Sequence, residues 1–145
     1  MSGLGLDVAQ TMVSSALSFA RKEMLKPLAV AVLDHRGTLK AFAADDGTSL
    51  RREQLARGKA EGALAMGMGT RAMQRWTPTH PHLIMSSASI IGSIVPLPGG
   101  VLVKDEDGRL LGAVGVSGDS SDNDERVAVA AIEAAALQAD PGSVD

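Results

Sequence analysis

The stretch PGGVLVKDEDGRLLGAVGVSG, residues 98–118, decides the fold. It contains two apolar runs, 100–105 and 109–117, separated by Glu106-Asp107-Gly108. Short runs rich in valine and leucine that are joined by a turn containing glycine are typical of consecutive β-strands. A second turn, Pro98-Gly99-Gly100, stands just before the first run. The stretch therefore predicts two neighbouring antiparallel strands.

Outward from this stretch the same pattern recurs, and it alternates with amphipathic segments. The run from Leu28 to Leu33 and the weakly alternating Thr38–Ala43 flank a turn at 34–37 and predict another hairpin. Apolar residues at helical spacing predict helices at both ends and in the middle of the chain. We expect helices over 4–26, 50–75 and 122–139, and strands over 28–33, 38–43, 89–97, 100–105 and 109–117. Residues 76–89, with two prolines and two histidines, are expected to form a loop with room for one helical turn.

The predicted order is α-β-β-α-β-β-β-α, in which hairpins outnumber crossovers. This order predicts an α+β fold with a mainly antiparallel five-stranded sheet flanked by helices. The chain has 145 residues, which is the size of one ordinary domain. It shows no repeat, linker or low-complexity tract, so we expect a single domain over residues 1–145.

Composition excludes several classes of protein. Cysteine is absent, which rules out disulfides, thiolate nucleophiles and zinc–cysteine sites. The net charge of −3 and an aromatic content of 2% argue against a nucleic-acid partner. No apolar run reaches the ~20 residues that span a bilayer, and no secretory signal is visible. We therefore expect no membrane association and a cytoplasmic location.

Three histidines are the first candidates for chemistry. His80 and His82 stand two residues apart, so they would lie on one side of an extended segment. Such a pair could ligate a metal or haem iron, or act as a general acid or base; the alternative is a polar loop with two exposed histidines. His35 is expected to be an exposed turn residue. A third ligand with zinc-site spacing is not visible, which weakens the case for a dedicated metal centre.

Anion-binding candidates lie elsewhere in the chain. Arg51 and Lys59 on the predicted second helix could bind a carboxylate. Lys59 could equally form a structural ion pair with Asp34, Asp45 or Asp46. Asp46 is also taken as a ligand-binding candidate.

The turn at Gly99 and Gly100 has two interpretations. Its glycines could present backbone amides to an anion or oxyanion. They could also simply build a tight turn.

An ordered set of short motifs resembles the GlcG/HbpS-like family, which includes the C-terminal domain of PduO adenosyltransferases. The set covers about residues 5–138. It consists of Asp34–Gly37, Ala44-Asp45-Asp46-Gly47, Ala56-Arg57-Gly58-Lys59-Ala60, Pro98-Gly99-Gly100-Val101, Gly112–Gly118 and Asp124-Glu125. The family commonly has Arg-Met-Asp-Gly where this chain has Ala44–Gly47, so a cation that could hold a propionate is replaced by alanine.

The resemblance implies a profilin-like α+β fold and a haem- or tetrapyrrole-binding protein, with haem degradation as an activity of some members. It also implies a homo-oligomer built from dimers that assemble further, up to octamers. Haem is then the expected cofactor, and Lys59 stands at the family's Lys-Ala position. Ligation of the iron varies within the family, so the resemblance names no axial ligand; His80 and His82 are candidate iron ligands from their residue type and spacing alone.

Two alternatives remain open from the sequence. One is a cofactor-free enzyme, such as an isomerase, hydratase, lyase or hydrolase, that acts on a small carboxylated metabolite. In that case His80 or His82 would be the general base, Arg51 or Lys59 the carboxylate clamp, and Gly99–Gly100 the oxyanion site. The other alternative is an oligomer with no ligand.

Overall fold

The two runs of the opening stretch form the hairpin predicted for them. The computed structural model describes residues 3–143 of the chain, so the outermost residues of the predicted domain, 1–2 and 144–145, lie outside the described part. Strand β3 (Gly100–Lys104) pairs antiparallel with β4 (Leu110–Ser117). The turn between them is held by Asp105, whose Oδ1 accepts the amides of Asp107 and Arg109, both at 2.9 Å.

The hairpin belongs to a five-stranded sheet with the order β2-β1-β4-β3-β5. Strands β1 (Ala29–Asp34), β2 (Leu39–Ala44) and β5 (Gln138–Asp140) complete it, and every pairing is antiparallel. The predicted α+β class with a five-stranded antiparallel sheet is therefore confirmed. Since β1 and β4 are interior strands with a helix layer on each face, nearly all of their side chains are buried.

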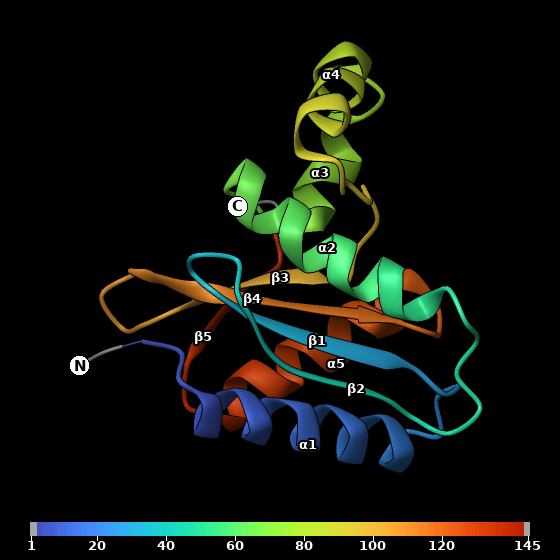
Figure 1. The fold of residues 1–145 in the computed structure, drawn as a ribbon, viewed down its shortest axis with the longest axis vertical. Helices are drawn as coiled ribbons and strands as arrows, with labels where there is room; N and C mark the ends of the chain where they lie inside the picture. The colour runs from blue at the N-terminus through green and yellow to red at the C-terminus, as the bar shows by residue number, and fades with distance from the viewer. Residues whose placement is uncertain (1–2, 144–145) are drawn as a thin grey trace.

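The two faces of the sheet are covered by different helices, as Figure 1 shows. Helices α1 (Leu6–Lys22) and α5 (Ser121–Ala134) lie on one face, and α2 (Arg52–Met66) lies on the other. Strand residues alternate between the faces. The α1–α5 face receives Val30, Val32, Val101, Val103, Val114 and Val116, and the α2 face receives Ala29, Ala31, Leu33, Leu102 and Ala113.

Helix α2 lies unusually close to the sheet. A Cβ added at Gly115 on β4 would be 1.9 Å from the carbonyl oxygen of Ala56 on α2. A Cβ at Gly100 on β3 would be 2.4 Å from the carbonyl oxygen of Lys59. Real side chains cannot approach a backbone atom so closely, so these glycines set the distance between the layers.

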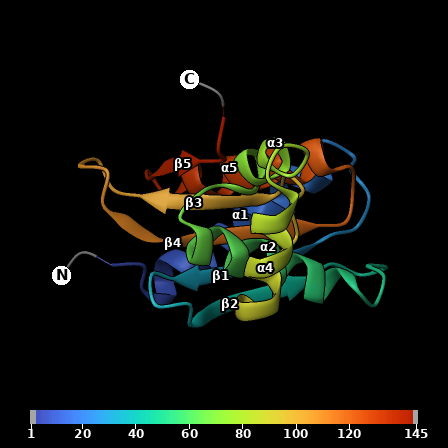
Figure 2. The same ribbon diagram turned by 90° about the horizontal axis from the view of Figure 1, so that it is seen from above.

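Two further helices stand away from the body. Helices α3 (Thr70–Trp76) and α4 (Pro81–Ile91), with the extended return segment 92–99, form what we call the arm. Figure 1 shows the arm above the sheet, beyond the α2 layer, and Figure 2, seen from above, places it in front of the strands. The expected helix 50–75 is interrupted here, because Gly67 takes a left-handed conformation (φ 70°) and ends α2.

Two local predictions are corrected in the arm. Residues 76–89, expected as a loop, are mostly helical, because Pro81 occupies a first-turn position that suits helix initiation. The strand expected over 89–97 does not exist: its first residues end α4, and Gly92 (φ 90°) then leads into an irregular segment. Pro96 and Pro98 have no amide to donate to a ladder. A short apolar run does not distinguish a strand from a helix by its pattern alone.

The fifth strand comes instead from the C-terminal end. The helix expected to continue to residue 139 ends at Ala134, and Ala136 takes a left-handed conformation (φ 60°). Residues 138–140 then pair with β3. Helix α5 begins at an N-cap, since the Ser120 hydroxyl accepts the amide of Asn123 at 3.2 Å. No helix among the described residues is long and apolar enough to cross a membrane.

The close approach of α2 gives a stability prediction. Gly115→Ala should lower the free energy of unfolding by about 1–3 kcal/mol or more, because the new methyl group forces α2 away from β4. Gly5→Ala is the matched control, since a Cβ at Gly5 meets nothing within 4 Å and its φ is −80°. Urea unfolding followed by circular dichroism measures both. Equal stability of the two variants would contradict the close approach.

Candidate functional site

The residues proposed from sequence fall into three separate places. His80 and His82 lie in the arm, Lys59, Gly99 and Gly100 are buried between α2 and the sheet, and Arg51 and Asp46 are exposed before the first turn of α2. Helix α2 has 15 residues, and such a helix is about 22 Å long. The arm leaves from its far end, so Arg51 cannot share a site with the arm histidines.

His80 is held in a defined orientation at the start of α4. Its ring stacks on Trp76, with the ring centroids 4.7 Å apart and an interplanar angle of 30°. Its backbone amide donates to the Trp76 carbonyl at 2.7 Å, and Trp76 ends α3. The turn between the two helices therefore places the imidazole on the indole ring, four residues back in the chain.

The neighbouring threonine contacts one of the two imidazole nitrogens of His80. Nδ1 of His80 is 2.8 Å from the Thr79 hydroxyl, which itself lies 3.3 Å from the Trp76 carbonyl. The hydroxyl has one hydrogen; when that hydrogen is donated to the carbonyl, the oxygen accepts from Nδ1–H. Nε2 then keeps its lone pair. An Nδ1–H fixed by a neighbouring acceptor is the usual arrangement of a metal-ligating histidine.

His82 is exposed, and no hydrogen bond or ring contact within the described residues orients its imidazole in this way. It is the second residue of α4, and residues two apart in a helix do not face each other. The two imidazoles are therefore not displayed side by side, as an extended segment would have placed them. The described residues contain no group of three histidine or acidic side chains that could hold a metal ion. Haem iron needs only one such protein ligand.

Several apolar side chains of the arm are exposed. Trp76 and Leu83 are 39% and 40% exposed, and Met85 is 69% exposed. Helix α4 carries no acidic or basic residue in its first or last turn. The arm thus offers one oriented imidazole beside an aromatic ring and open aliphatic surface, which are two of the features a porphyrin requires.

Lys59 is part of a buried ion pair, and its partner differs from those expected. Its Nζ donates to Asp124 Oδ2 at 3.2 Å and to the Val116 carbonyl at 2.9 Å. Lys59 is 2% exposed and Asp124 1%. The structural-pair interpretation is therefore observed, but with Asp124 on α5 in place of Asp34, Asp45 or Asp46. No sequence signal linked residues 59 and 124, because the pair forms only when helices on opposite faces meet at one end of the sheet.

Burial opposes the charge on both members of this pair. Desolvation lowers the pKa of Lys59, and the nearby Asp124 carboxylate raises it in part. Desolvation likewise raises the pKa of Asp124, and attraction to Lys59 opposes that shift. The Asp124 carboxylate also accepts the Asp119 amide at 2.9 Å. Neither group is available to an external anion.

Gly99 and Gly100 leave room for the buried Lys59–Asp124 pair and for the close approach of α2. They do not form an open anion site. A Cβ at Gly99 would be 2.8 Å from Lys59 Nζ, so glycine leaves the space that the lysine head occupies. The Gly100 amide donates to the Thr70 hydroxyl at 2.8 Å. The structure therefore does not assemble the site expected for a cofactor-free enzyme. The candidate bases, His80 and His82, lie in the arm, apart from Arg51, while Lys59 and the Gly100 amide are already hydrogen-bonded within the protein.

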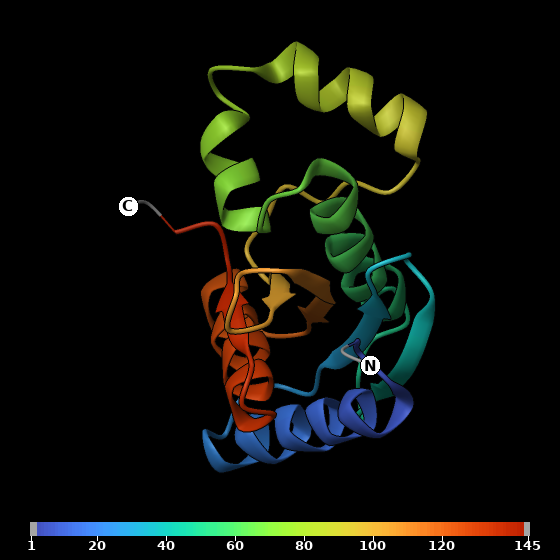
Figure 3. The same cartoon turned by 90° about the vertical axis from the view of Figure 1, so that its left-hand side faces the viewer.

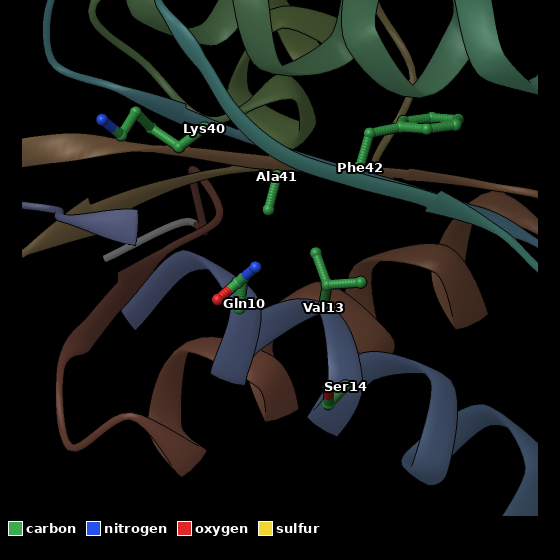
Figure 4. Close-up of a pocket in the computed structure, with 6 residues that line it drawn as sticks. All are labelled: Gln10, Val13, Ser14, Lys40, Ala41 and Phe42. Carbon is green, nitrogen blue, oxygen red and sulfur yellow. The ribbon is translucent and has the colours of Figure 1, made fainter. Parts of the chain in front are cut away.

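Two surface hollows lie apart from the arm histidines. One of about 500 Å³ lies between α1 and β2, lined by Gln10, Val13, Ser14, Lys40, Ala41 and Phe42. Figure 4 shows Val13 and Ala41 pointing toward each other there, while Phe42 points away to the other face. Another hollow is lined by His35, Arg36, Glu61, Leu64 and Ile91. His35 is thus the only histidine that lines one of the hollows described above.

Trp76 and Thr79 are the site residues that sequence reasoning missed. Trp76 is the only tryptophan of the chain, and it stands four residues before His80. That spacing brings two residues together only if the segment turns helically. The segment was expected to be a loop, so the contact could not be anticipated.

Comparison with known proteins places this geometry in context. The model of a family described as "Haem degrading protein HbpS-like" matches residues 4–133. A structure described as a PduOC:haem complex is 27% identical, with a TM-score of 0.81, over 92% of this chain and 95% of that chain. A double variant of HbpS from Streptomyces reticuli is 26% identical, with a TM-score of 0.80, over 92% and 87% of the two chains.

Protein ORFY from Klebsiella pneumoniae shares the fold at 22% identity, with a TM-score of 0.83 over 94% of this chain and 93% of that one. No curated protein sequence matches this chain significantly.

The buried ion pair gives the second stability prediction. Lys59→Met and Asp124→Asn should each lower the free energy of unfolding by about 3–5 kcal/mol, because each leaves its partner buried without a counter-charge. The double variant should lose at least about 1 kcal/mol less than the sum of the two single losses. Arg57→Met, which breaks an exposed pair with Glu61, should cost under about 1 kcal/mol. Urea unfolding measures all four; strictly additive losses would show that the two charges do not interact.

Proposed function

The chain belongs to the HbpS-like family, and from this we propose that it binds haem through the arm, with His80 as the iron ligand. The observation that carries the proposal is the family match over residues 4–133. The similarity to a haem complex over nearly the whole of both chains supports it. The proposal includes assembly into homo-oligomers and a cytoplasmic location.

The residues of the arm fit the demands of a haem. An axial ligand must present a lone pair, and Nε2 of His80 presents one when Nδ1 carries the proton and donates it to the Thr79 hydroxyl. Trp76 fixes the ring plane by stacking, and Leu83 lies one helical turn beyond His80. These contacts favour His80 over His82, which the sequence alone could not separate.

Bound haem would supply a redox-active iron, and degradation of the porphyrin by an external oxidant is the activity that the family description suggests. The protein's part would be to orient and cover the macrocycle. His80 would hold the iron while Trp76 and the apolar surface of α4 exclude water from part of the ring. Lys59 and Arg51, the cations considered from the sequence as carboxylate ligands, lie outside the arm and would not hold a propionate of a haem bound there.

Absorption titration with hemin tests the proposal. The wild-type protein should give a saturable Soret shift at one haem per chain. His80→Ala should weaken the apparent affinity at least tenfold, because the axial nitrogen is lost. His82→Ala, two residues further along and also exposed, is the matched control and should change it less than threefold.

The other outcomes separate the parts of the proposal. A weak, non-saturating response that neither substitution alters would overturn haem binding itself. A specific shift that His80→Ala leaves intact and His35→Ala removes would overturn the assignment of the ligand, and would place haem at the hollow beside Leu64 and Ile91.

A further inference from the structure

The arm joins the body of the protein through α3, and the C-terminal part of the chain lies against that helix. Strand β5 continues into residues 141–143, and we call residues 138–143 the strap. Figure 3 shows the strap, in red, rising from the sheet to the lower end of α3, while α4 crosses the top of the molecule. Arg75 of α3 and Gly142 of the strap are in contact there, although they are 67 residues apart in the chain.

The strap and α3 are in backbone contact through two glycines. A Cβ at Gly69, directly before α3, would be 2.1 Å from the carbonyl carbon of Pro141. A Cβ at Gly142 would be 2.7 Å from the amide nitrogen of Ala72. Gly142 also has a φ of 85°, which side chains other than glycine rarely adopt. Each side of the contact therefore requires glycine, and a side chain at either position would push the strap away from α3.

Hydrogen bonds join the strap to both ends of α3. The amide of Arg71, near the start of the helix, donates to the Pro141 carbonyl at 3.3 Å. The guanidinium of Arg75, in the last turn, donates to the Gly142 carbonyl. Arg75 directly precedes Trp76, whose ring stacks on the imidazole of the arm. The strap thus holds the turn of α3 from which the stacked pair begins.

The strap is itself fixed to the sheet. Ala139 pairs with Val103 of β3 in the antiparallel ladder. One carboxylate oxygen of Asp140 accepts from the Lys104 ammonium at 2.7 Å, and the other accepts the Gly142 amide at 3.1 Å. The hydrogen bond from Lys104 lowers the pKa of the Asp140 carboxyl group, so this residue is charged at neutral pH. The sheet is therefore the fixed body against which the strap holds the arm.

Helix α3 is too short to be stable by itself. It has seven residues, and an isolated helix of that length does not form in water. The Thr70 hydroxyl accepts the Gly100 amide at 2.8 Å, and the Arg71 guanidinium pairs with two carboxylates of α5. These contacts hold the first two residues of the helix. The strap also reaches the last turn, through Arg75.

We infer that the strap is a positioning element for the arm, because by holding α3 it fixes the place and orientation of Trp76 and His80. The fold of the sheet does not depend on it, since β5 is a three-residue strand at the sheet edge. The effect on the arm stands on these contacts alone. Its consequence for haem rests on the proposed function: an imidazole that samples several orientations binds iron more weakly than one that is already in place.

Hydrogen exchange of single amides, measured by NMR, tests the inference. The amides of Thr77 and His80 donate to carbonyls of α3, and they should exchange at least tenfold faster in Gly142→Ala than in Gly108→Ala. Gly108→Ala is the matched control, because Gly108 has nearly the same φ, 81°, but a Cβ there meets nothing within 4 Å. The amide of Val32, on an interior strand, should exchange no faster in Gly142→Ala than in the control.

The fluorescence of Trp76 provides a second measurement, because it is the only tryptophan of the chain. In the wild type the stacked ring has little freedom of motion. The share of fluorescence anisotropy lost through sub-nanosecond motion should at least double in Gly142→Ala. Gly69→Ala, which alters the other side of the same contact, should reproduce this change. Gly108→Ala should match the wild type.

A hemin titration of the same variants separates this inference from the proposed function. Gly142→Ala should weaken the apparent affinity at least threefold, and Gly108→Ala should leave it unchanged. Exchange rates and anisotropy that are equal in the two variants would overturn the positioning role, whatever the titration shows. A loosened arm that binds haem as tightly as the wild type would overturn its consequence for haem. A wild type that binds no haem would overturn the proposed function, while the exchange and fluorescence measurements still decide the inference.

Discussion

The buried ion pair between Lys59 and Asp124 is the interaction on which the rest of the structure depends. It joins α2 on one face of the sheet to α5 on the other. The Lys59 ammonium also donates a hydrogen bond to the carbonyl of Val116 at the end of β4. A charge pair so deeply buried is stable only when its remaining hydrogen-bonding capacity is met. The Asp119 amide meets part of it. Asp119 is itself held by hydrogen bonds from Asn123, Lys26 and Ser120. The same hydrogen bonds lower the pKa of its carboxyl group to about 2.

The contact between α2 and the sheet around this ion pair accounts for the glycines at positions 99, 100 and 115 and for the path of the chain into β3. Gly99 leaves space for the lysine head, while Gly100 and Gly115 let α2 lie almost in backbone contact with the sheet. The β3 strand therefore begins directly beneath α2, and the chain must reach it from above that helix. The return segment does so along Gly58 and Gly62.

The sequence was informative wherever local pattern and tertiary structure agree. The hairpins at 28–43 and 100–117 could be predicted because alternation and turn residues specify them locally. The segment 89–97 could not, because its apolar residues fit a strand as well as a helix and only packing decides between them. The partner of Lys59 was missed for a related reason: Asp124 is 65 residues away, and only the meeting of two helix layers brings it near. The contact of Trp76 with His80 depends on a helical turn. That turn was not expected, because the two prolines of residues 76–89 favoured a loop.

The central claim is that His80 on the arm is the iron ligand, and resonance Raman spectroscopy of the reduced haem complex tests it most directly. Histidine labelled with ¹⁵N in the imidazole ring identifies the iron–histidine stretching band by its isotope shift. The account predicts a labelled band in the wild type and in His82→Ala, and its loss in His80→Ala. A labelled band that persists in His80→Ala, or no such band in the wild type, would contradict it.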